Sequence, residues 1–332
     1  MEHIASRRLG AITTAGRDLS RPESVLATAR GDIFVSHKGY GVARILPDGR
    51  QYLLAGPTQI GGLPVVPNGI ALRADGSFLV ANISDAGGLL QLDADGLRPF
   101  HSCAASGPPP PVNFVTLDAL GRIWFSVSST CRPRHLAYRR DVRNGYVGVI
   151  DDKGMRIVLE GLHYTNEIRP DLASGWLYIA ETFGQKITRV RLDERGLHGL
   201  PQTFATLPRG AFVDGIALDR EGALLCACIV SNELIRVTPD GMWSILLTER
   251  DDAWVDQVEA ALDAGTMGRV HFDTAPTWVL RNISSLAFAG DGLDRILCGN
   301  LLGGSLPALS IGIEGQAPLH WNVDVPLWGK AF

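Results

Sequence analysis

Cysteine is scarce in this chain, and its spacing excludes a CxxC motif. Only five cysteines occur among 332 residues, namely Cys103, Cys131, Cys226, Cys228 and Cys298. Cys226 and Cys228 alternate within an apolar segment, which is typical of small side chains buried on a β-strand. We therefore expect buried, reduced cysteines.

Long apolar runs and runs of one charge are absent as well. No stretch of 18 apolar residues occurs, so we expect no transmembrane helix, and the opening residues MEHIASRRLGAITTAG lack the apolar core of a signal peptide. The 31 basic and 35 acidic residues give a net charge of −4, with no run of five like charges. We predict a cytoplasmic protein with neither a nucleic acid nor a membrane as its partner, and the oligomeric state stays open.

Several familiar catalytic motifs are also missing. The chain has no GxSxG, HExxH or Walker A motif and no convincing GxGxxG. A hydrophobic content of 45% and a charged content of 20% are ordinary for a soluble globular protein with a sizeable core. The 38 glycines indicate many tight turns. Any active site must therefore be found from the arrangement of strands and turns.

A repeat is the main feature that is present. Six segments share one frame, a polar residue followed by a short strand, a tight turn and a second strand, as in PNGIALRADGSFLVA and VDGIALDREGALLCA. The polar residues that begin these frames, here called head residues, are Glu23, Asn68, Asn113, Asn166, Asp214 and Ser284. They recur at intervals of 45, 45, 53, 48 and 70 residues. A period near 45 with several short strands is typical of β-propeller blades, so we predict an all-β, six-bladed β-propeller that forms one domain over residues 1–332.

Two segments near the end of the chain depart from the repeat. The last long interval contains residues 249–275, where Trp254, Val258 and Leu262 fall at helical spacing, so we predict a short helical insertion in the last blade. The tail APLHWNVDVPLWGKAF is too short for a blade. We expect it to contribute a strand that closes the ring with the first blade and covers an exposed edge.

The segment of residues 129–145 is long for a strand connection and rich in arginine. A lid over one face and a solvated loop both explain its length and composition. Tyr138 and Arg140 within it are candidates for contact with an acidic substrate, but we favour an exposed charged loop as their explanation.

The head residues point to chemistry at the centre of the ring. The first strand of each propeller blade lines the central channel, so residues at one repeat position converge there. Glu23, Asn113, Asn166 and Asp214 would bring together two carboxylates and two amide oxygens, a set that suits a hard divalent cation. Ca²⁺ is favoured, and Mg²⁺, Mn²⁺, Zn²⁺ and Fe²⁺ are alternatives. Taken singly, Asn-Gly and Asp-Gly pairs are also ordinary turn residues.

These repeats carry a family resemblance. The segments VPNGIALRADGSFLVA, TNEIRPDLASGWLYIAETFG and VDGIALDREGALLCA resemble the repeats of the gluconolactonase/regucalcin (senescence-marker protein) family, over about residues 20–310. The resemblance implies a six-bladed propeller with one central divalent metal that hydrolyses sugar lactones and related esters. It also implies Glu23, Asn166 and Asp214 as metal ligands, and Asn113 as a residue at both the metal and the substrate.

The chain departs from that family at three positions. The family often has an arginine two residues before the asparagine at 113 and an aspartate after it, both contacting sugar hydroxyls, whereas this chain has Pro111 and Phe114. Glu167 stands where the family usually has glycine. We therefore predict a lactone substrate less hydroxylated than gluconolactone. The substrate-binding candidates are Asn113, His37, Asn68, Phe114 and Ser284.

Together these observations predict a metal-dependent lactonase in which the metal polarises the carbonyl and Asp214 is the general base. One alternative is a phosphotriesterase-like hydrolase resembling diisopropylfluorophosphatase, in which Asp214 attacks phosphorus directly. Another is a calcium-binding propeller without catalytic activity. Whether His37 takes part in proton transfer is left open.

Overall fold

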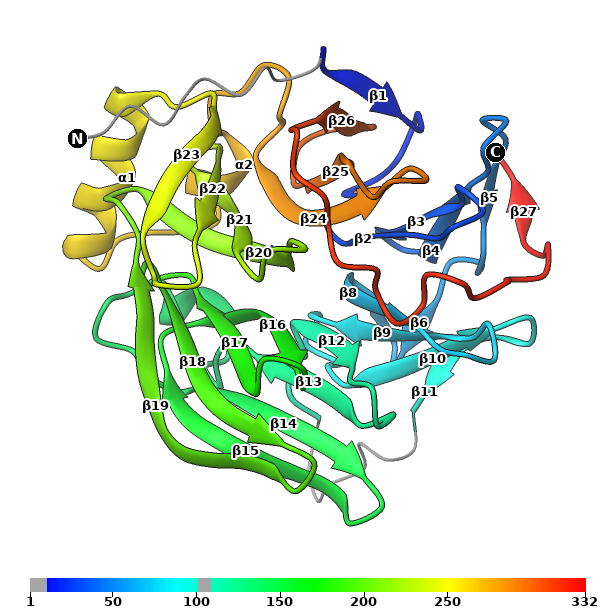
Figure 1. The fold of residues 1–332 in the computed structure, drawn as a ribbon, viewed down its shortest axis with the longest axis horizontal. Coiled ribbons are helices and arrows are strands. Elements are labelled where there is room, and N and C mark those ends of the chain that lie inside the picture. Colours follow the sequence, from blue (N-terminus) through cyan, green and yellow to red (C-terminus); the bar gives the residue numbers. More distant parts are fainter. Residues whose placement is uncertain (1–10, 101–108) are drawn as a thin grey trace.

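Six antiparallel sheets follow one another along the chain and form a ring (Figure 1). The structure is a computed structural model that describes residues 11–100 and 109–332. Blade 1 contains β2 (Val25–Ala27), β3 (Ile33–His37), β4 (Gly41–Ile45) and β5 (Gln51–Leu53). Blade 2 contains β8 (Pro67–Leu72), β9 (Phe78–Asn82), β10 (Leu89–Asp93) and β11 (Gly96–Pro99). Blade 3 contains β12 (Phe114–Leu117), β13 (Ile123–Val127), β14 (Gly145–Asp151) and β15 (Gly154–Leu162).

The other three blades have the same order from the inside of the ring outwards. Blade 4 contains β16 (Thr165–Asp171), β17 (Trp176–Glu181), β18 (Lys186–Asp193) and β19 (Gly196–Thr206). Blade 5 contains β20 (Ala211–Leu218), β21 (Leu224–Val230), β22 (Glu233–Val237) and β23 (Trp243–Thr248). Blade 6 contains β24 (Ile283–Ala289), β25 (Arg295–Asn300), β26 (Leu306–Ser310) and β1 (Thr13–Ala15). A small hairpin of β6 (Gln59–Ile60) and β7 (Leu63–Pro64) links blades 1 and 2. The prediction of a six-bladed β-propeller is thus confirmed.

Aspartate and glycine form the turns within the blades. In blade 2, the Asp75 carboxylate accepts a hydrogen bond from the Ser77 amide at 3.0 Å, and Gly76 has a φ of 83° that favours glycine. The Gly76 amide donates to the Arg73 carbonyl at 3.0 Å. Such turns reverse the chain within few residues, which lets successive strands pair in order.

The ring is closed differently from the sequence-based expectation. β1, from the start of the chain, pairs with β26 and places Thr13 opposite Ala308 as the outermost strand of blade 6. Because β1 and β2 are consecutive in the chain, this pairing ties the last blade to the first. The tail does add a strand to blade 1, since β27 (Lys330–Ala331) pairs with β5. It is a fifth, outer strand, so the prediction that the tail closes the ring was wrong.

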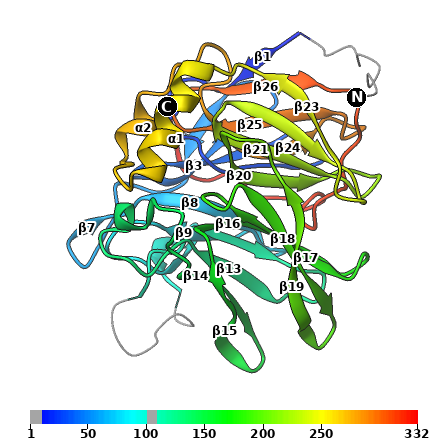
Figure 2. The same cartoon turned by 90° about the vertical axis from the view of Figure 1, so that its left-hand side faces the viewer.

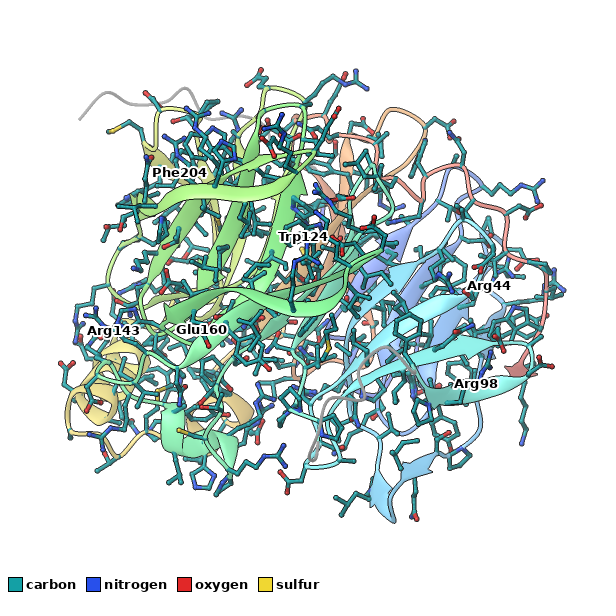
Figure 3. All side chains as sticks on the ribbon, turned by 90° about the horizontal axis from the view of Figure 1, so that it is seen from below. Arg44, Arg98, Trp124, Arg143, Glu160 and Phe204 are labelled. Carbon is teal, nitrogen blue, oxygen red and sulfur yellow. The ribbon has the colours of Figure 1, made fainter. Side chains whose placement is uncertain are left out.

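The hydrophobic core is divided among the interfaces between blades. Six clusters of buried side chains each join two neighbouring sheets, and each of the six interfaces has one. The cluster between blades 3 and 4, for example, contains Trp124, Ile168 and Leu177. Figure 3 shows side chains filling the space between neighbouring sheets, with Trp124 labelled near the middle. Each blade is therefore stabilised by both of its neighbours.

A seventh cluster lies on one face of the ring and joins two insertions. The helices α1 (Asp252–Asp263) and α2 (Val270–Asp273) lie between β23 and β24, and the 3₁₀ helix η2 (Arg134–Ala137) lies between β13 and β14. Figure 2 shows α1 and α2 on the left-hand face of the ring. The residues joining these insertions to blades 4 and 5, here called the roof cluster, include Tyr138, Tyr164, Phe183, Phe212, Val258, Leu262 and Phe272.

The helices occur within the predicted insertion of residues 249–275. The Asp251 carboxylate caps α1 by accepting a hydrogen bond from the Trp254 amide at 2.8 Å. Val258 and Leu262 face the roof cluster, as their spacing indicates, and Trp254 packs at its margin. In the part of the chain that the structure describes, no helix has the length and apolar character needed to cross a membrane.

Candidate active site

All six head residues lie where an inner strand begins. Glu23 and Asn113 stand just before β2 and β12, and the other four are near the first residues of β8, β16, β20 and β24. Strand direction alternates within each antiparallel blade, so every inner strand begins on the same face of the ring. We call this the head end. All six side chains are buried, with exposed fractions of 8% or less.

Hydrogen bonds join head residues of neighbouring blades. The Asn68 amide nitrogen Nδ2 donates to the Asn113 carbonyl at 2.9 Å and to Asn113 Oδ1 at 3.3 Å. The Ser284 hydroxyl donates to the Glu23 carbonyl at 3.1 Å, across the seam between blades 6 and 1. The head residues therefore form a polar layer in which two neighbouring pairs are hydrogen-bonded directly.

β-bulges at the head end set these side chains apart from the regular pleat. The pairing of β20 with β21 shifts between Val213 and Gly215, so Asp214 has no residue opposite it. The pairing of β24 with β25 shifts in the same way around Ser284. Similar shifts flank Asn68 on β8 and Asn166 on β16. A bulge re-aims the side chain that it carries, which explains why four blades present a polar group at this position.

The glycines that follow two head residues have a packing role. A Cβ atom on Gly215 would lie 2.5 Å from the Ser285 Cα, and one on Gly69 would lie 2.6 Å from the Phe114 Cα. Both contacts are too short for a real Cβ, so only glycine lets these inner strands approach so closely. The Asp-Gly and Asn-Gly pairs thus lie at the crowded beginnings of strands, and turn formation does not account for them.

The Asp214 carboxyl is in an unfavourable place for an isolated charge. Burial raises the pKa of Asp214 well above its usual range, and the negative charges of Glu23 and Glu167 raise it further. The positive charges of Arg21 and Arg269 act in the opposite direction. Among the described residues, none donates a hydrogen bond to this carboxylate. Asp214 and Glu23 are therefore close enough to interact, and a cation between them would favour both charged forms.

The two asparagine amides are held by neighbouring groups. Asn166 Nδ2 donates to Thr182 Oγ1 at 3.1 Å, and that hydroxyl donates to the Val213 carbonyl at 2.9 Å. With its nitrogen engaged, Asn166 offers Oδ1 as a ligand atom. Asn68 Oδ1 is buried without a hydrogen-bond partner among residues 11–100 and 109–332. A buried oxygen of this kind fits a site that takes a cation or a polar substrate.

The chemistry of these donors fits a hard cation. Glu23, Asp214, Asn166 and Asn113 offer carboxylate and amide oxygens, which Ca²⁺ prefers. In the described residues, no group of three or more His, Cys, Asp or Glu side chains is placed to hold a metal. Any cation here would therefore depend on amide oxygens as well as carboxylates, a donor set that suits Zn²⁺ and Fe²⁺ less well.

Glu167 connects three blades one position further along. Its carboxylate accepts hydrogen bonds from the Ser285 hydroxyl at 2.7 Å and the Ile216 amide at 3.1 Å. Arg169 Nη2 pairs with it at 2.9 Å. Burial raises the pKa of Glu167, although Arg169 lowers it. The glutamate that departs from the family pattern is therefore a link between blades that also acts electrostatically on Asp214.

The other predicted substrate-binding residues lie in different surroundings. The Phe114 side chain belongs to the core between blades 3 and 4, with the Arg169 guanidinium 5.1 Å from its ring. His37 is buried against the rings of Tyr40 and Phe332, at centroid distances of 5.4 and 5.8 Å. Burial lowers the pKa of His37, and the Lys38 and Asp18 backbones oppose this. No head residue is among the groups that shift the pKa of His37.

The long loop of residues 129–145 packs against the helical insertion. Arg140 forms ion pairs with Glu259 and Asp263 of α1. The Tyr138 ring lies 5.4 Å from the rings of both Tyr164 and Phe272 in the roof cluster. The two residues considered for an acidic substrate thus hold the two insertions together.

Sequence reasoning missed three arginines at the head end. Arg21 forms an ion pair with Glu23, and the charges of Arg134 and Arg269 both act on Glu23. Arg134 lies in the loop of residues 129–145, which stands out in the sequence as rich in arginine. Arg21 and Arg269 belong to no motif. Their proximity depends on how the two insertions fold over the ring.

A cavity of about 290 Å³ lies at the other end of the inner strands. It is lined mainly by apolar side chains of all six inner strands, among them Ile70, Ala217 and Leu286, and by the tail residues Pro318 and His320. None of the six head residues lines it. This cavity and the polar layer of head residues are therefore separate features.

The fold and the head residues together define a six-bladed propeller with a buried layer of oxygen donors at one end. The family model described as SMP-30/Gluconolactonase/LRE-like region matches residues 33–245, so this chain belongs to that family. The match includes Asn68, Asn113, Asn166 and Asp214 but not Glu23 or Ser284. No curated protein sequence matches the chain.

Three solved structures share the fold. A luciferin-regenerating enzyme has a TM-score of 0.67 at 13% identity, covering 96% of this chain and all of its own. The gluconolactonase XC5397 from Xanthomonas campestris has a TM-score of 0.65 at 19% identity, covering 93% of both chains. The calcium-binding protein regucalcin from Agrobacterium tumefaciens has a TM-score of 0.63 at 17% identity, covering 91% of this chain and 96% of its own. Such low identities establish a common fold only.

Proposed function

We propose that this protein is a lactonase whose active site is the head end of the propeller. The observation that carries the proposal is the pairing of two buried carboxylates, Glu23 and Asp214, beside the amides of Asn113 and Asn166 in a member of this family. Buried acids at one end of a channel are costly for stability, which favours a catalytic role. The similarity to a gluconolactonase supports a cyclic ester as the substrate.

A divalent cation would be held by Glu23, Asn166 and Asp214, with Asn113 beside it. Ca²⁺ is the favoured ion because all four side chains offer oxygen, and a structural neighbour is described as calcium-binding. When bound, the cation would polarise the lactone carbonyl and stabilise the oxyanion that develops on it.

The protein's own residues supply the remaining chemistry. Asp214 accepts the proton of the attacking water on a carboxylate oxygen, as a general base. Asn113, fixed through its backbone carbonyl by Asn68, orients the substrate. Thr182 keeps Asn166 in one orientation. The roof cluster on the same face limits the access of water from that side.

The substrate is a lactone less hydroxylated than gluconolactone. Pro111 and Phe114 occupy the two positions where the family often places polar side chains for sugar hydroxyls, and both are buried. Phe114 packs in the core, so it adds no polar group at the head end. A ring with few hydroxyl groups leaves fewer donors unpaired in such a site.

A panel of lactones tests this function directly. Weakly hydroxylated γ- and δ-lactones, gluconolactone and a phosphotriester are assayed with and without EDTA, while bound metals are measured by elemental analysis. We expect chelator-sensitive hydrolysis of lactones, with a higher kcat/KM for the weakly hydroxylated ones. Faster turnover of gluconolactone would contradict the substrate assignment.

Two other results would replace the proposal. Hydrolysis of the phosphotriester without lactone hydrolysis would support the diisopropylfluorophosphatase-like alternative. Calcium binding without turnover of any substrate would support a non-catalytic propeller. Activity that persists in a metal-free, chelator-treated sample would remove the cation from the mechanism.

A further inference from the structure

Three arginines from separate segments gather around one carboxylate at the head end. Arg21 lies two residues before Glu23 and pairs with it. Arg134 begins η2, and Arg269 immediately precedes α2. The charges of Arg134 and Arg269 act on both Arg21 and Glu23, so all three guanidinium groups share one neighbourhood.

Arg134 forms no ion pair of its own with the acidic residues among residues 11–100 and 109–332. Its Nη2 atom donates to the Tyr164 hydroxyl at 2.9 Å and to the Ser128 hydroxyl at 3.4 Å. Its Nε atom is buried, with no hydrogen-bond partner in the described part of the chain, and the same is true of Arg21 Nη1. Two guanidinium groups therefore have buried N–H donors that no described residue satisfies, which is costly unless a ligand accepts from them.

Positive charge would exceed negative charge in this neighbourhood once a divalent cation is bound. Of the three arginines, Arg21 pairs with Glu23, and Arg269 Nε donates to Asp273 Oδ1 at 2.9 Å. Arg134 forms no ion pair with any described residue, and the Asp214 carboxyl also interacts with Arg21 and Arg269. A divalent cation on Glu23 and Asp214 would offset both carboxylates and leave a surplus of positive charge. With a cation bound, the head end thus favours an anion.

We propose that Arg134 and Arg269 bind a carboxylate group carried by the lactone substrate, away from its reacting carbonyl. This inference rests on the proposed lactonase function and narrows its substrate class to anionic lactones. The planar guanidinium group matches a carboxylate in geometry and remains charged at all physiological pH values. This chain lacks the two polar side chains with which the family often contacts sugar hydroxyls. The two insertions supply instead two guanidinium groups that bind negative charge.

The positions of the two arginines suit an entrance. The Arg269 side chain is 42% exposed and Arg134 is half-buried, so a ligand from solvent reaches Arg269 first. Arg140 of the same loop is held by Glu259 and Asp263 of α1, which fixes the loop relative to the helices. Both arginines therefore come from segments that the roof cluster holds in place.

Two substrates that differ only in the charge of one substituent test the role of the carboxylate. 5-Oxotetrahydrofuran-2-carboxylate and its primary amide share one lactone ring and differ by one negative charge. For Arg134→Gln we expect the KM of the carboxylate to rise about tenfold or more, while the KM of the amide stays within about twofold. Only the carboxylate forms charge-assisted hydrogen bonds with the arginine, so only its binding is weakened by the substitution. Arg269→Gln has the same effect, at roughly threefold, because this side chain is more exposed.

Arg139→Gln is the matched control in the same loop. Arg139 pairs with Asp141 at the surface, at 2.8 Å, and we expect no change in either KM. Thermal unfolding of each variant is measured in parallel. If Arg134→Gln fails to fold, the more exposed Arg269→Gln and the charge-retaining Arg269→Lys still decide the question. Equal KM increases for carboxylate and amide would overturn the inference.

Equilibrium binding separates this inference from the lactonase proposal. Glutarate and inorganic phosphate are titrated into the metal-loaded protein by calorimetry, without any turnover. Glutarate binding that is weakened about tenfold in Arg134→Gln supports the inference even if no lactone is hydrolysed. Absent glutarate binding, binding unchanged in both arginine variants, or tighter binding of phosphate than of glutarate would overturn the carboxylate assignment.

Discussion

The two ends of the inner strands differ sharply although the same six strands form both. The head end holds Glu23, Asp214 and the amides, with arginines beside them, whereas the opposite end is a mainly apolar cavity partly lined by the tail. A strand rises about 3.3 Å per residue, so four residues, from Asp214 to Leu218, separate the two environments by roughly 13 Å.

The partners and the protonation of ionisable groups inside the ring also differ between the two ends. Towards the cavity, Arg169 is paired with Glu167, and burial together with Arg169 lowers the pKa of His320 to about 4, so this histidine is neutral. At the head end, by contrast, Arg134 has no acidic partner among the described residues and the Asp214 carboxyl resists ionisation. The buried, unsatisfied donors of Arg21 and Arg134 thus favour a ligand at the head end.

The largest expected effect is on catalysis at the head end. Asp214→Asn keeps an amide oxygen for a cation but cannot accept a proton, so we expect kcat to fall by about 10²- to 10⁴-fold with metal retained. Asp171→Asn is the control, because Asp171 lies on an inner strand at the cavity end. The measurement is kcat with bound metal quantified in the same sample. Near wild-type kcat in a metal-loaded Asn variant would remove Asp214 as the base.

The next effect is on stability at the cavity end. Ile70 is 1% exposed and packs between blades 1 and 2, so we expect Ile70→Ala to lower the free energy of unfolding by roughly 3 kcal/mol. The kcat of the folded variant should be unchanged. Leu319→Ala, at an exposed residue lining the same cavity, should cost little. A large fall in kcat for Ile70→Ala in denaturation-corrected assays would show that the two ends are coupled.

A smaller effect is expected where the insertions meet. Glu259 is 1% exposed and binds Arg140, Gln185 and the Gly210 amide. Glu259→Gln leaves buried donors without an acceptor, and we expect a loss of about 2 kcal/mol in denaturant unfolding. Asp263→Asn is the control, because this partner of Arg140 is 63% exposed and should contribute under about 1 kcal/mol. Equal losses for both variants would refute the distinction.

An effect of similar size at neutral pH, which vanishes in acid, concerns Glu181, which lies beside the Thr182 that supports Asn166. Burial would raise the pKa of Glu181, but hydrogen bonds from His163 and Thr188 and the charge of Lys186 lower it to about 2. A lowered carboxyl pKa stabilises the fold above about pH 4.5, and this contribution is lost as the pH falls towards 2.

Unfolding of wild type and Glu181→Gln should therefore differ by about 2 kcal/mol at pH 7 and by much less near pH 2.5. The measurement is urea denaturation at both pH values. Lys153, an exposed residue in a turn of blade 3, gives the control variant Lys153→Gln, which should show no such change. A difference that stays constant with pH would show that the Glu181 charge does not contribute.

Much of the architecture could be predicted because it depends on local signals. The head residues and the turns between strands repeat in the sequence, and α1 shows its helical spacing. Ring closure could not be predicted, because β1 and β27 are short and many edges in the ring accept such a strand equally well. The arginines were missed because Arg21, Arg134 and Arg269 lie in three unrelated segments.

The roles of single residues were harder to predict than their position in the repeat. The sequence around Gly69 and Gly215 suggested turns, yet these glycines allow the close approach of neighbouring inner strands. Phe114 occupies a family substrate position but packs in the core. Whether the four proposed ligands bind a cation stays a prediction, which the metal analysis above will test.

The sequence by itself determined the blades, because strand alternation and turn chemistry act over a few residues and repeat six times. It also indicated which oxygen donors lie at the same end of the ring, since one repeat phase places them at one end of parallel inner strands. Only the tertiary structure decided the charge around them. The roof cluster positions two insertions over the head end, and electrostatic energy depends on distances through space that no spacing along the chain encodes.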